Sequence, residues 1–157
     1  MNEEETPHGK AGAPRVAGLA VNAGLGTILQ LSVASTFTTV ANRVTIDGPT
    51  REVTTAETTT LDSTVRTFRG VILDNGEVSG TLYFDPQDPT HLALTGLLTA
   101  FPIAPGSWKL KFADAAATTY SFSGPLTKLA LNGMEIEGNL GADFTIKVSG
   151  PITESHT

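Results

Sequence analysis

The clearest pattern of apolar and polar positions lies between Glu77 and Phe84. Apolar side chains and glycine alternate there with polar ones, which is the period of a strand that buries one face. The inward positions are Val78, Gly80, Leu82 and Phe84, and the outward positions are Glu77, Ser79, Thr81 and Tyr83. The pattern predicts a half-buried antiparallel strand.

A pattern with helical spacing follows this strand. Asp88 precedes Pro89, and this pair is typical of a helix N-cap followed by the first helical position. Apolar side chains then recur along one helical face, at Leu94, Leu97, Leu98 and Phe101. Pro102 predicts the end of the helix.

Shorter alternating runs indicate further strands on both sides of this unit. They cover residues 27–33, 37–47, 108–112, 120–122, 125–131 and 135–148. In the second run Val40, Val44 and Ile46 are expected on one face, and Asn75-Gly76 is expected to be a turn. Because turns rather than helical crossovers separate the runs, we expect a mainly β protein. Its predicted fold is an antiparallel β-sandwich or barrel of about seven or eight strands with one flanking α-helix.

Residues 51–61 do not fit this scheme. Their β-branched side chains favour an extended backbone, yet neither face of the segment is apolar. Such a strand adds little to a core and leaves backbone groups that still require partners. Two interpretations remain open, a solvated loop or an arm that completes its hydrogen bonding in an assembly.

The two ends of the chain are polar. Residues 1–24 hold three consecutive glutamates, two prolines and small residues without a period, which predicts a flexible N-terminal arm. This arm is either a tail without a role or a segment that orders on a neighbouring subunit. Residues 25–150 are expected to form one domain, and residues 151–157 a short polar C-terminal tail.

Composition and charge exclude several classes of protein. The 157 residues are 39 % hydrophobic and 17 % charged, and ten Lys and Arg against sixteen Asp and Glu give a net charge of −6. This balance disfavours nucleic-acid binding through phosphates. The absence of cysteine excludes disulfides and thiolate chemistry and fits a reducing cytoplasm. No apolar run reaches the roughly 20 residues of a transmembrane helix, and the first residues lack the regions of a signal peptide.

Candidate catalytic and metal-binding groups are few. Asp85, Asp88 and His91 are close in sequence, but a turn and a helix cap account for both aspartates, and we expect His91 to be a partly exposed helix residue. Glu135 and Glu137 share a strand face, which is common on solvated surfaces and makes no acid–base pair by itself. A metal site requires three or four converging ligands. We therefore expect no catalytic residue, metal or cofactor.

Several motifs together carry a resemblance to a known family. They are GTILQ at 26–30, FTTVA at 37–41, TTLDSTVRTF at 59–68, DNGEVS at 74–79 and FDPQDPTHLAL at 84–94. With these motifs the sequence resembles the major tail tube proteins of bacteriophages with long, non-contractile tails, over about residues 24–150. It departs from that family at Val71-Ile72, where a Gly-Leu type pair is more usual, and no immunoglobulin-like decoration domain follows Val148.

The resemblance implies a β-sandwich with a flanking helix and a long extended hairpin loop. In the family, six copies form a ring, and stacked rings make a tube whose inner β-barrel surrounds a lumen that conducts DNA into the host. Residues 48–70 would then be the inter-ring loop. The expected contact residues between subunits are Arg51, Glu52, Glu57, Leu61, Asp62, Arg66, Phe68 and Arg69.

An acidic lumen would let DNA pass without binding to it, since a basic wall would hold a duplex tightly. From the alternation of strand residues, the candidate acidic lumen residues are Glu77, Glu137 and Asp143. The resemblance implies that the partners are further copies of the chain and the tape measure, tail tip and terminator proteins. It implies no association with a membrane. The protein would be a virion tail component made in the host bacterial cytoplasm.

Two other functions remain open. One is a monomeric β-sandwich that binds a receptor or carbohydrate, or decorates a virion, and it would present a platform of exposed aromatic side chains. The other is the tube subunit of a contractile tail or a secretion system, which shares the ring architecture.

Overall fold

A computed structural model of the chain describes residues 24–134 and 138–157. The described part is mainly β, with 52 % strand and 8 % helix, and its sheets are antiparallel. One sheet has five strands, one has four, and a separate ribbon has two. This confirms the predicted class, an antiparallel β-sandwich with one helix and a long hairpin.

The five-stranded sheet combines the two ends of the described chain. Its strands are, in spatial order, β11 (Ser149–Ser155), β8 (Thr119–Gly124), β7 (Gly106–Lys111), β1 (Ile28–Val33) and β2 (Thr36–Thr39). Inward alternation in β1 and β7 buries Leu29, Leu31, Trp108 and Leu110. The buried Trp108 ring also donates a hydrogen bond from Nε1 to the Gly124 carbonyl, at 2.9 Å.

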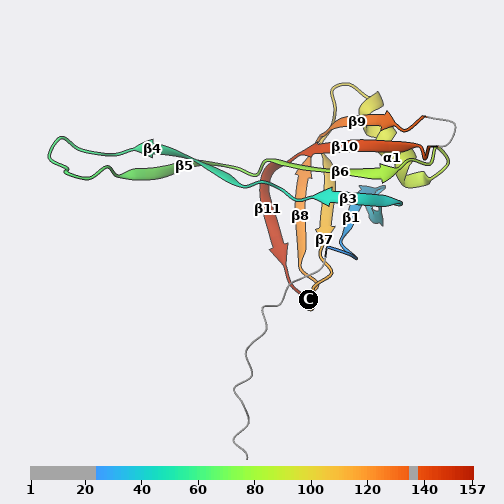
Figure 1. Cartoon of the computed structure of the whole chain (residues 1–157), viewed down its shortest axis with the longest axis horizontal. Coiled ribbons are helices and arrows are strands. Elements are labelled where there is room, and N and C mark those ends of the chain that lie inside the picture. Colours follow the sequence, from blue (N-terminus) through green and yellow to red (C-terminus); the bar gives the residue numbers. More distant parts are fainter. Residues whose placement is uncertain (1–23, 135–137) are drawn as a thin grey trace, which may run out of the picture.

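The four-stranded sheet forms the second layer. Its strands are, in spatial order, β3 (Arg43–Asp47), β6 (Glu77–Tyr83), β10 (Gly141–Lys147) and β9 (Leu126–Asn132). The alternation predicted for 77–84 is confirmed, because Val78, Gly80 and Leu82 are buried. Figure 1 shows the strands of the two sheets running across each other, and the core lies between them.

The helix α1 (Pro89–Thr99) closes one end of the four-stranded sheet and packs against β9. Asp88 is its N-cap and accepts hydrogen bonds from the Thr90 and His91 N–H groups, as predicted. Leu94 is buried and Leu97 and Leu98 pack against the core. Phe101 was expected on this apolar face, and that expectation is wrong. The helix ends at Thr99, so Phe101 lies beyond it and is 93 % exposed.

Three other predictions about strands are corrected. The run 37–47 is two strands rather than one, because Asn42 takes a positive φ of 52° between β2 and β3. Val44 does not share the burial of Val40 and is 52 % exposed, because the β3–β6 register shifts between Arg43 and Thr45. Residues 151–157 are not a tail, since β11 pairs with β8 over Ser149–Ser155. The predicted N-terminal arm lies outside the described residues, apart from Gly24.

Candidate assembly surfaces

The most prominent feature of the molecule is a ribbon that projects from the sandwich. The strands β4 (Glu52–Glu57) and β5 (Phe68–Asp74) pair only with each other among the described strands. They continue β3 and β6, so the chain leaves the four-stranded sheet along one edge, reverses at 58–67 and returns. Figure 1 shows this hairpin extending far from both sheets. It is therefore built without support from the subunit's own core.

Apolar side chains occupy part of one face of this hairpin. Val53 lies opposite Leu73, and Phe68 lies on the same face nearer the tip, opposite Glu57. Val53 also covers Gly70, where an added Cβ would lie 2.9 Å from Val53 Cγ1. The loop predicted from the sequence spans 48–70, and no apolar face is expected in 51–61. That holds for β4 alone, but the apolar side chains come from β5, whose seven residues are all exposed.

The predicted contact residues fall almost entirely on the hairpin. Glu52 and Glu57 are on β4, Leu61, Asp62 and Arg66 lie in the connecting loop, and Phe68 and Arg69 are on β5. Arg66 approaches Glu57 within the hairpin, with 3.9 Å between Nε and Oε1. Arg51 differs, because its guanidinium lies 5.2 Å from the centre of the Tyr120 ring. Arg51 thus contacts the subunit's own sandwich at the base of the hairpin.

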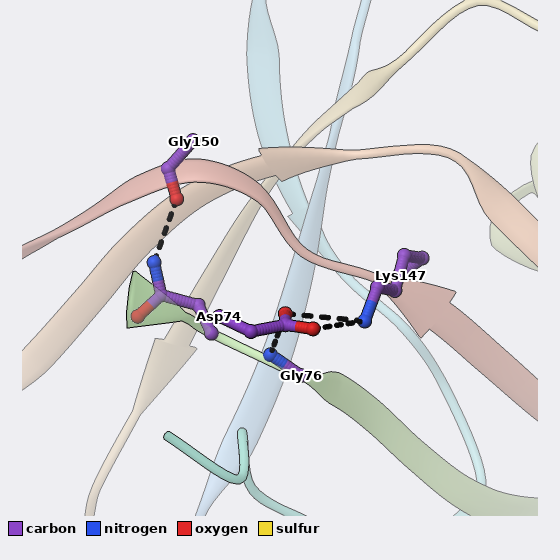
Figure 2. A network of polar contacts seen from close by, with 5 residues as sticks. Asp74, Gly76, Lys147 and Gly150 are labelled. Atoms are coloured by element: carbon purple, nitrogen blue, oxygen red, sulfur yellow. Dashed lines mark hydrogen bonds and ion pairs between the residues drawn. The ribbon is translucent and has the colours of Figure 1, made fainter. Parts of the chain in front are cut away.

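The base of the hairpin is fixed by a network of polar contacts (Figure 2). Lys147 Nζ lies 3.2 Å from both carboxylate oxygens of Asp74. The same carboxylate accepts the Gly76 N–H at 2.8 Å. These two donors, the Gly76 N–H first and Lys147 second, hold the pKa of Asp74 below its ordinary value. The network ties the returning strand to β10 where the hairpin leaves the sandwich.

Asn75-Gly76 is not the turn that the dipeptide predicts. The chain passes through it from β5 into β6, with a positive φ of 65° at Gly76. Asn75 is 8 % exposed and donates from Nδ2 to the Gly150 carbonyl at 2.7 Å. The Gly76 carbonyl accepts the Val148 N–H at 3.0 Å. The dipeptide joins two strands end to end because partners from 148–150, distant in sequence, hold its polar groups.

The outward face of the four-stranded sheet carries the predicted acidic residues that the structure describes. Glu77 lies opposite Lys147, and Asp143 lies opposite Thr81 on the same face. Asp47, which is not among the predicted lumen residues, joins them through its pairing with Ser79. Lys128 on β9 lies opposite Thr145, so it is the second basic residue of this face. The third candidate, Glu137, lies outside the described residues.

The outward face of the five-stranded sheet has a different charge. Lys109 is on this face, and its ammonium lies 4.0 Å from the centre of the Phe37 ring. Lys111 faces the same way, and hydroxyl side chains such as Ser121 and Ser123 occupy the neighbouring strand. The two outward faces of the sandwich therefore differ in charge. The face of the four-stranded sheet carries three carboxylates and two ammonium groups, and the face of the five-stranded sheet carries two ammonium groups among hydroxyls.

His91 is a structural residue, and the prediction that it would be partly exposed is wrong. It is completely buried, and its ring stacks on Phe84 with centroids 5.4 Å apart. Its Nδ1 accepts the Asp85 N–H at 2.9 Å, which leaves the Nε2 proton to bond the Ala41 carbonyl at 3.1 Å. Both ring nitrogens thus have backbone partners. No three His, Asp or Glu side chains converge on a metal position in the described part.

A half-open cleft of about 890 Å³ lies between β3 and the five-stranded sheet. Apolar side chains such as Ile46, Leu110 and Phe112 make up much of its wall. Its carboxylate Asp114 accepts hydrogen bonds from the Thr118 hydroxyl and N–H, which lower the pKa of Asp114. The Thr118 hydroxyl also lies 3.0 Å from Nδ1 of the exposed His156. Because the single hydroxyl proton of Thr118 is donated to Asp114, the imidazole can only donate to this oxygen and does not act on it as a base. No helix in the described part is long and apolar enough to cross a membrane.

No protein-family model and no curated protein matches the sequence. Solved structures are nevertheless similar in fold. One similar chain comes from the tail of an empty gene transfer agent (GTA) particle, whose structure was obtained by helical refinement with C6 symmetry. It matches with a TM-score of 0.71 and 15 % identity, over 86 % of this chain and 99 % of that chain. A chain from the cap that terminates the tube of the anti-feeding prophage matches with a TM-score of 0.70 and 12 % identity, over 94 % of this chain and 99 % of that one.

A third similar chain belongs to the sheath–tube complex of an extracellular contractile injection system in the extended state. It matches with a TM-score of 0.66 and 9 % identity, over 90 % of this chain and 96 % of that chain. At these identities the likeness establishes the fold. The chain thus shares its β-sandwich, over nearly the full length of each relative, with chains found in phage-like tails and contractile injection machines.

Proposed function

We propose that this chain is the subunit of a tail tube, and that it assembles into stacked, hexameric rings around a lumen. The observation that carries the proposal is the projecting hairpin, whose apolar side chains lie in solvent on a fold shared with chains of tails and injection machines. An exposed apolar surface of this kind is typical of an interaction site. In a tube, the neighbouring subunits cover it.

The four-stranded sheet is our candidate for the wall of the lumen. Its edge strands β3 and β9 each have one neighbour in the described sheet, so pairing between adjacent subunits would join six such sheets into a closed barrel and remove the edges. Its outward face carries Asp47, Glu77 and Asp143. A duplex has one negative charge per about 1.7 Å and would pass such a wall without being held.

The particle we propose is the virion of a phage with a long, non-contractile tail. The partners are then other copies of the chain and the tape measure, tail tip and terminator proteins, and the subunit is made in the host bacterial cytoplasm. The role is structural, with no catalytic step, metal or cofactor. A tube inside a contractile sheath is the second candidate, and it is favoured by the likeness to the contractile injection system. Electron microscopy of the particles separates the two, because only the contractile type has a sheath around its tube.

Electron microscopy of concentrated purified protein tests the tube itself. Rings or tubes of uniform diameter are the expected result, and a protein that stays monomeric with every initiator and is missing from particle tails would overturn the proposal. Hydrogen exchange adds a residue-level test. An isolated two-stranded ribbon is marginally stable, so amides of 48–70 should exchange rapidly in the monomer and become protected in tubes. Protection already present in the monomer would contradict the contact role of the hairpin.

A further inference from the structure

Exposed apolar side chains occur at two opposite ends of the molecule. One set is on the hairpin, where Phe68 is 60 % exposed. The other is at α1 and the segment that follows it, where Leu92 is 55 % and Phe101 93 % exposed. Figure 1 shows the hairpin projecting to the left of the four-stranded sheet and α1 beside the right-hand end of that sheet. The two surfaces of one subunit therefore lie too far apart to cover each other.

The α1 end has few charges for a surface in water. Between Pro86 and Trp108 the only Asp, Glu, Lys or Arg is Asp88, and Asp88 caps the helix. The exposed side of α1 carries Leu92, Thr95 and Thr99, whereas a helix that faces solvent normally carries charged side chains there. This composition is typical of the centre of an interface, which is depleted in charge.

One charge on the hairpin suits the α1 end. Residues 52–74 have a net charge of −2, from Arg66 and Arg69 against Glu52, Glu57, Asp62 and Asp74. Arg66 already lies 3.9 Å from Glu57, whereas Arg69 makes no ion pair within the described residues. The α1 end carries Asp85 and Asp88, and no Lys or Arg lies between Tyr83 and Trp108. Asp85 is exposed, and its carboxylate accepts only the Gln87 N–H among the described residues, at 2.9 Å. A basic side chain from another copy thus has a carboxylate available to it.

We propose that the hairpin of one copy packs on the α1 end of a second copy, with Phe68 against Leu92 and Phe101 and with Arg69 beside Asp85. The contact is heterologous, because two different surfaces meet, and such a contact does not close between two subunits. Each copy offers a free hairpin at one end and a free α1 surface at the other. The proposal rests on the proposed tube, and it names the surface in the adjacent ring that receives the hairpin.

Thiol cross-linking tests the contact. The unmodified chain has no cysteine, so only the introduced cysteines can react. One variant carries Phe68→Cys and a second carries Leu92→Cys, and the two are mixed, assembled and treated with a short bis-maleimide. Covalent dimers should form in tubes and not in the dissolved monomers. A chain with both substitutions should give a ladder of long oligomers, since each copy then links to one above and one below. Phe68→Cys paired with Ser107→Cys, on the five-stranded sheet, is the matched control and should give no dimer.

The outcomes separate the two proposals. If the variants form no tubes while the unmodified chain does, Leu92→Ser and Leu92→Cys are compared by circular dichroism, so that misfolding is distinguished from a lost contact. If tubes form and the Phe68→Cys and Leu92→Cys pair gives no dimer, the α1 end is not the receiving surface and the inference is overturned, although the tube stands. If the unmodified chain makes no tubes with any initiator, the proposed function itself fails.

A charge exchange gives an independent readout. Arg69→Asp and Asp85→Arg should each raise the concentration needed for assembly by roughly 5-fold, which corresponds to about 1 kcal/mol at each contact. The double variant restores opposite charges and should recover most of the loss. Thermal unfolding of the monomers should be nearly unchanged, because Arg69 and Asp85 are both exposed. Additive losses in the double variant would show that these two residues do not meet.

Discussion

Asn75 Nδ2 lies 2.7 Å from the carbonyl oxygen of Gly150 and joins two segments that are 75 residues apart in sequence. The donor is in the link between β5 and β6, and the acceptor is on β11. Because the hairpin contacts the sandwich mainly at its base, this bond and its neighbours determine the direction in which the hairpin projects (Figure 2).

Replacement of Asn75 by alanine should destabilise the subunit by about 1–2 kcal/mol. The change leaves the Gly150 carbonyl without its donor and removes a nearly buried amide. Urea unfolding of the monomer measures the loss. Gln87→Ala is the matched control, because Gln87 is exposed and engages Asp85 through its backbone N–H alone, and its effect should stay within about 0.5 kcal/mol. Equal effects of the two variants would contradict a role for the Asn75 bond.

Gly76 should be the least replaceable residue of the junction. Its φ is +65°, and an added Cβ would lie 2.3 Å from the backbone oxygen of Thr50, so the two strands at the base of the hairpin would have to separate. We expect Gly76→Ala to destabilise by about 2 kcal/mol or more. Gly96→Ala provides a contrast, because that helical position has open space and alanine should stabilise it by about 0.5–1 kcal/mol. The same unfolding assay reads both, and a neutral Gly76→Ala would show that the junction is adaptable.

The ion pair between Asp74 and Lys147 at the junction should make the stability of the subunit depend on pH. Hydrogen bonds from the Gly76 N–H and Lys147 lower the pKa of Asp74 in the folded protein. A lowered folded pKa contributes stability above the unfolded value of about 3.9, and that contribution is lost as the pH falls through the folded pKa. The difference in thermal unfolding midpoint between the unmodified chain and Asp74→Ala should therefore be largest near about pH 6 and shrink below about pH 4. A difference that does not change with pH would mean that the carboxylate charge contributes nothing.

Local patterns predicted the elements whose environment is local. The alternation at 77–84 and the Asp88-Pro89 cap specify β6 and the start of α1, because a strand's two faces and a helix's first turn depend on adjacent residues. The polar composition of 51–61 likewise indicated a segment outside the core, and β4 is exposed at every position except Ala56.

Elements held by distant partners were missed. β11 has few apolar residues, and it is a strand because its backbone pairs with β8 and its Gly150 carbonyl receives Asn75. Asn75-Gly76 has the composition of a turn, yet contacts with 147–150 determine its course. The apolar face of the hairpin was missed for a related reason. Leu73 and Phe68 come from the strand opposite 51–61, and only the pairing of β4 with β5 places them on the same face as Val53.

The charge of the two sheet faces predicts which of them meets DNA. If the four-stranded sheet lines the lumen, a chain with both Glu77→Lys and Asp143→Lys changes that wall from acidic to basic, since Lys128 and Lys147 are already on it. Tubes of this variant, assembled with short duplex DNA and washed, should retain DNA that nuclease does not digest. Retention should fall steeply with salt, because bound lysines displace the counterions of the duplex.

The matched control places two lysines on the other sheet through Ser107→Lys and Thr153→Lys, at outward positions of β7 and β11. Those tubes should bind DNA that nuclease digests, because the five-stranded sheet would then be the outer surface. Protected DNA in the control and none in the Glu77→Lys, Asp143→Lys tubes would place the five-stranded sheet inside. The two variants change the net charge of −6 to −2 and to −4 respectively, so the amount of bound DNA does not by itself identify the lumen. The protection of the bound DNA from nuclease does, because it depends on whether the face that carries the lysines lies inside the tube.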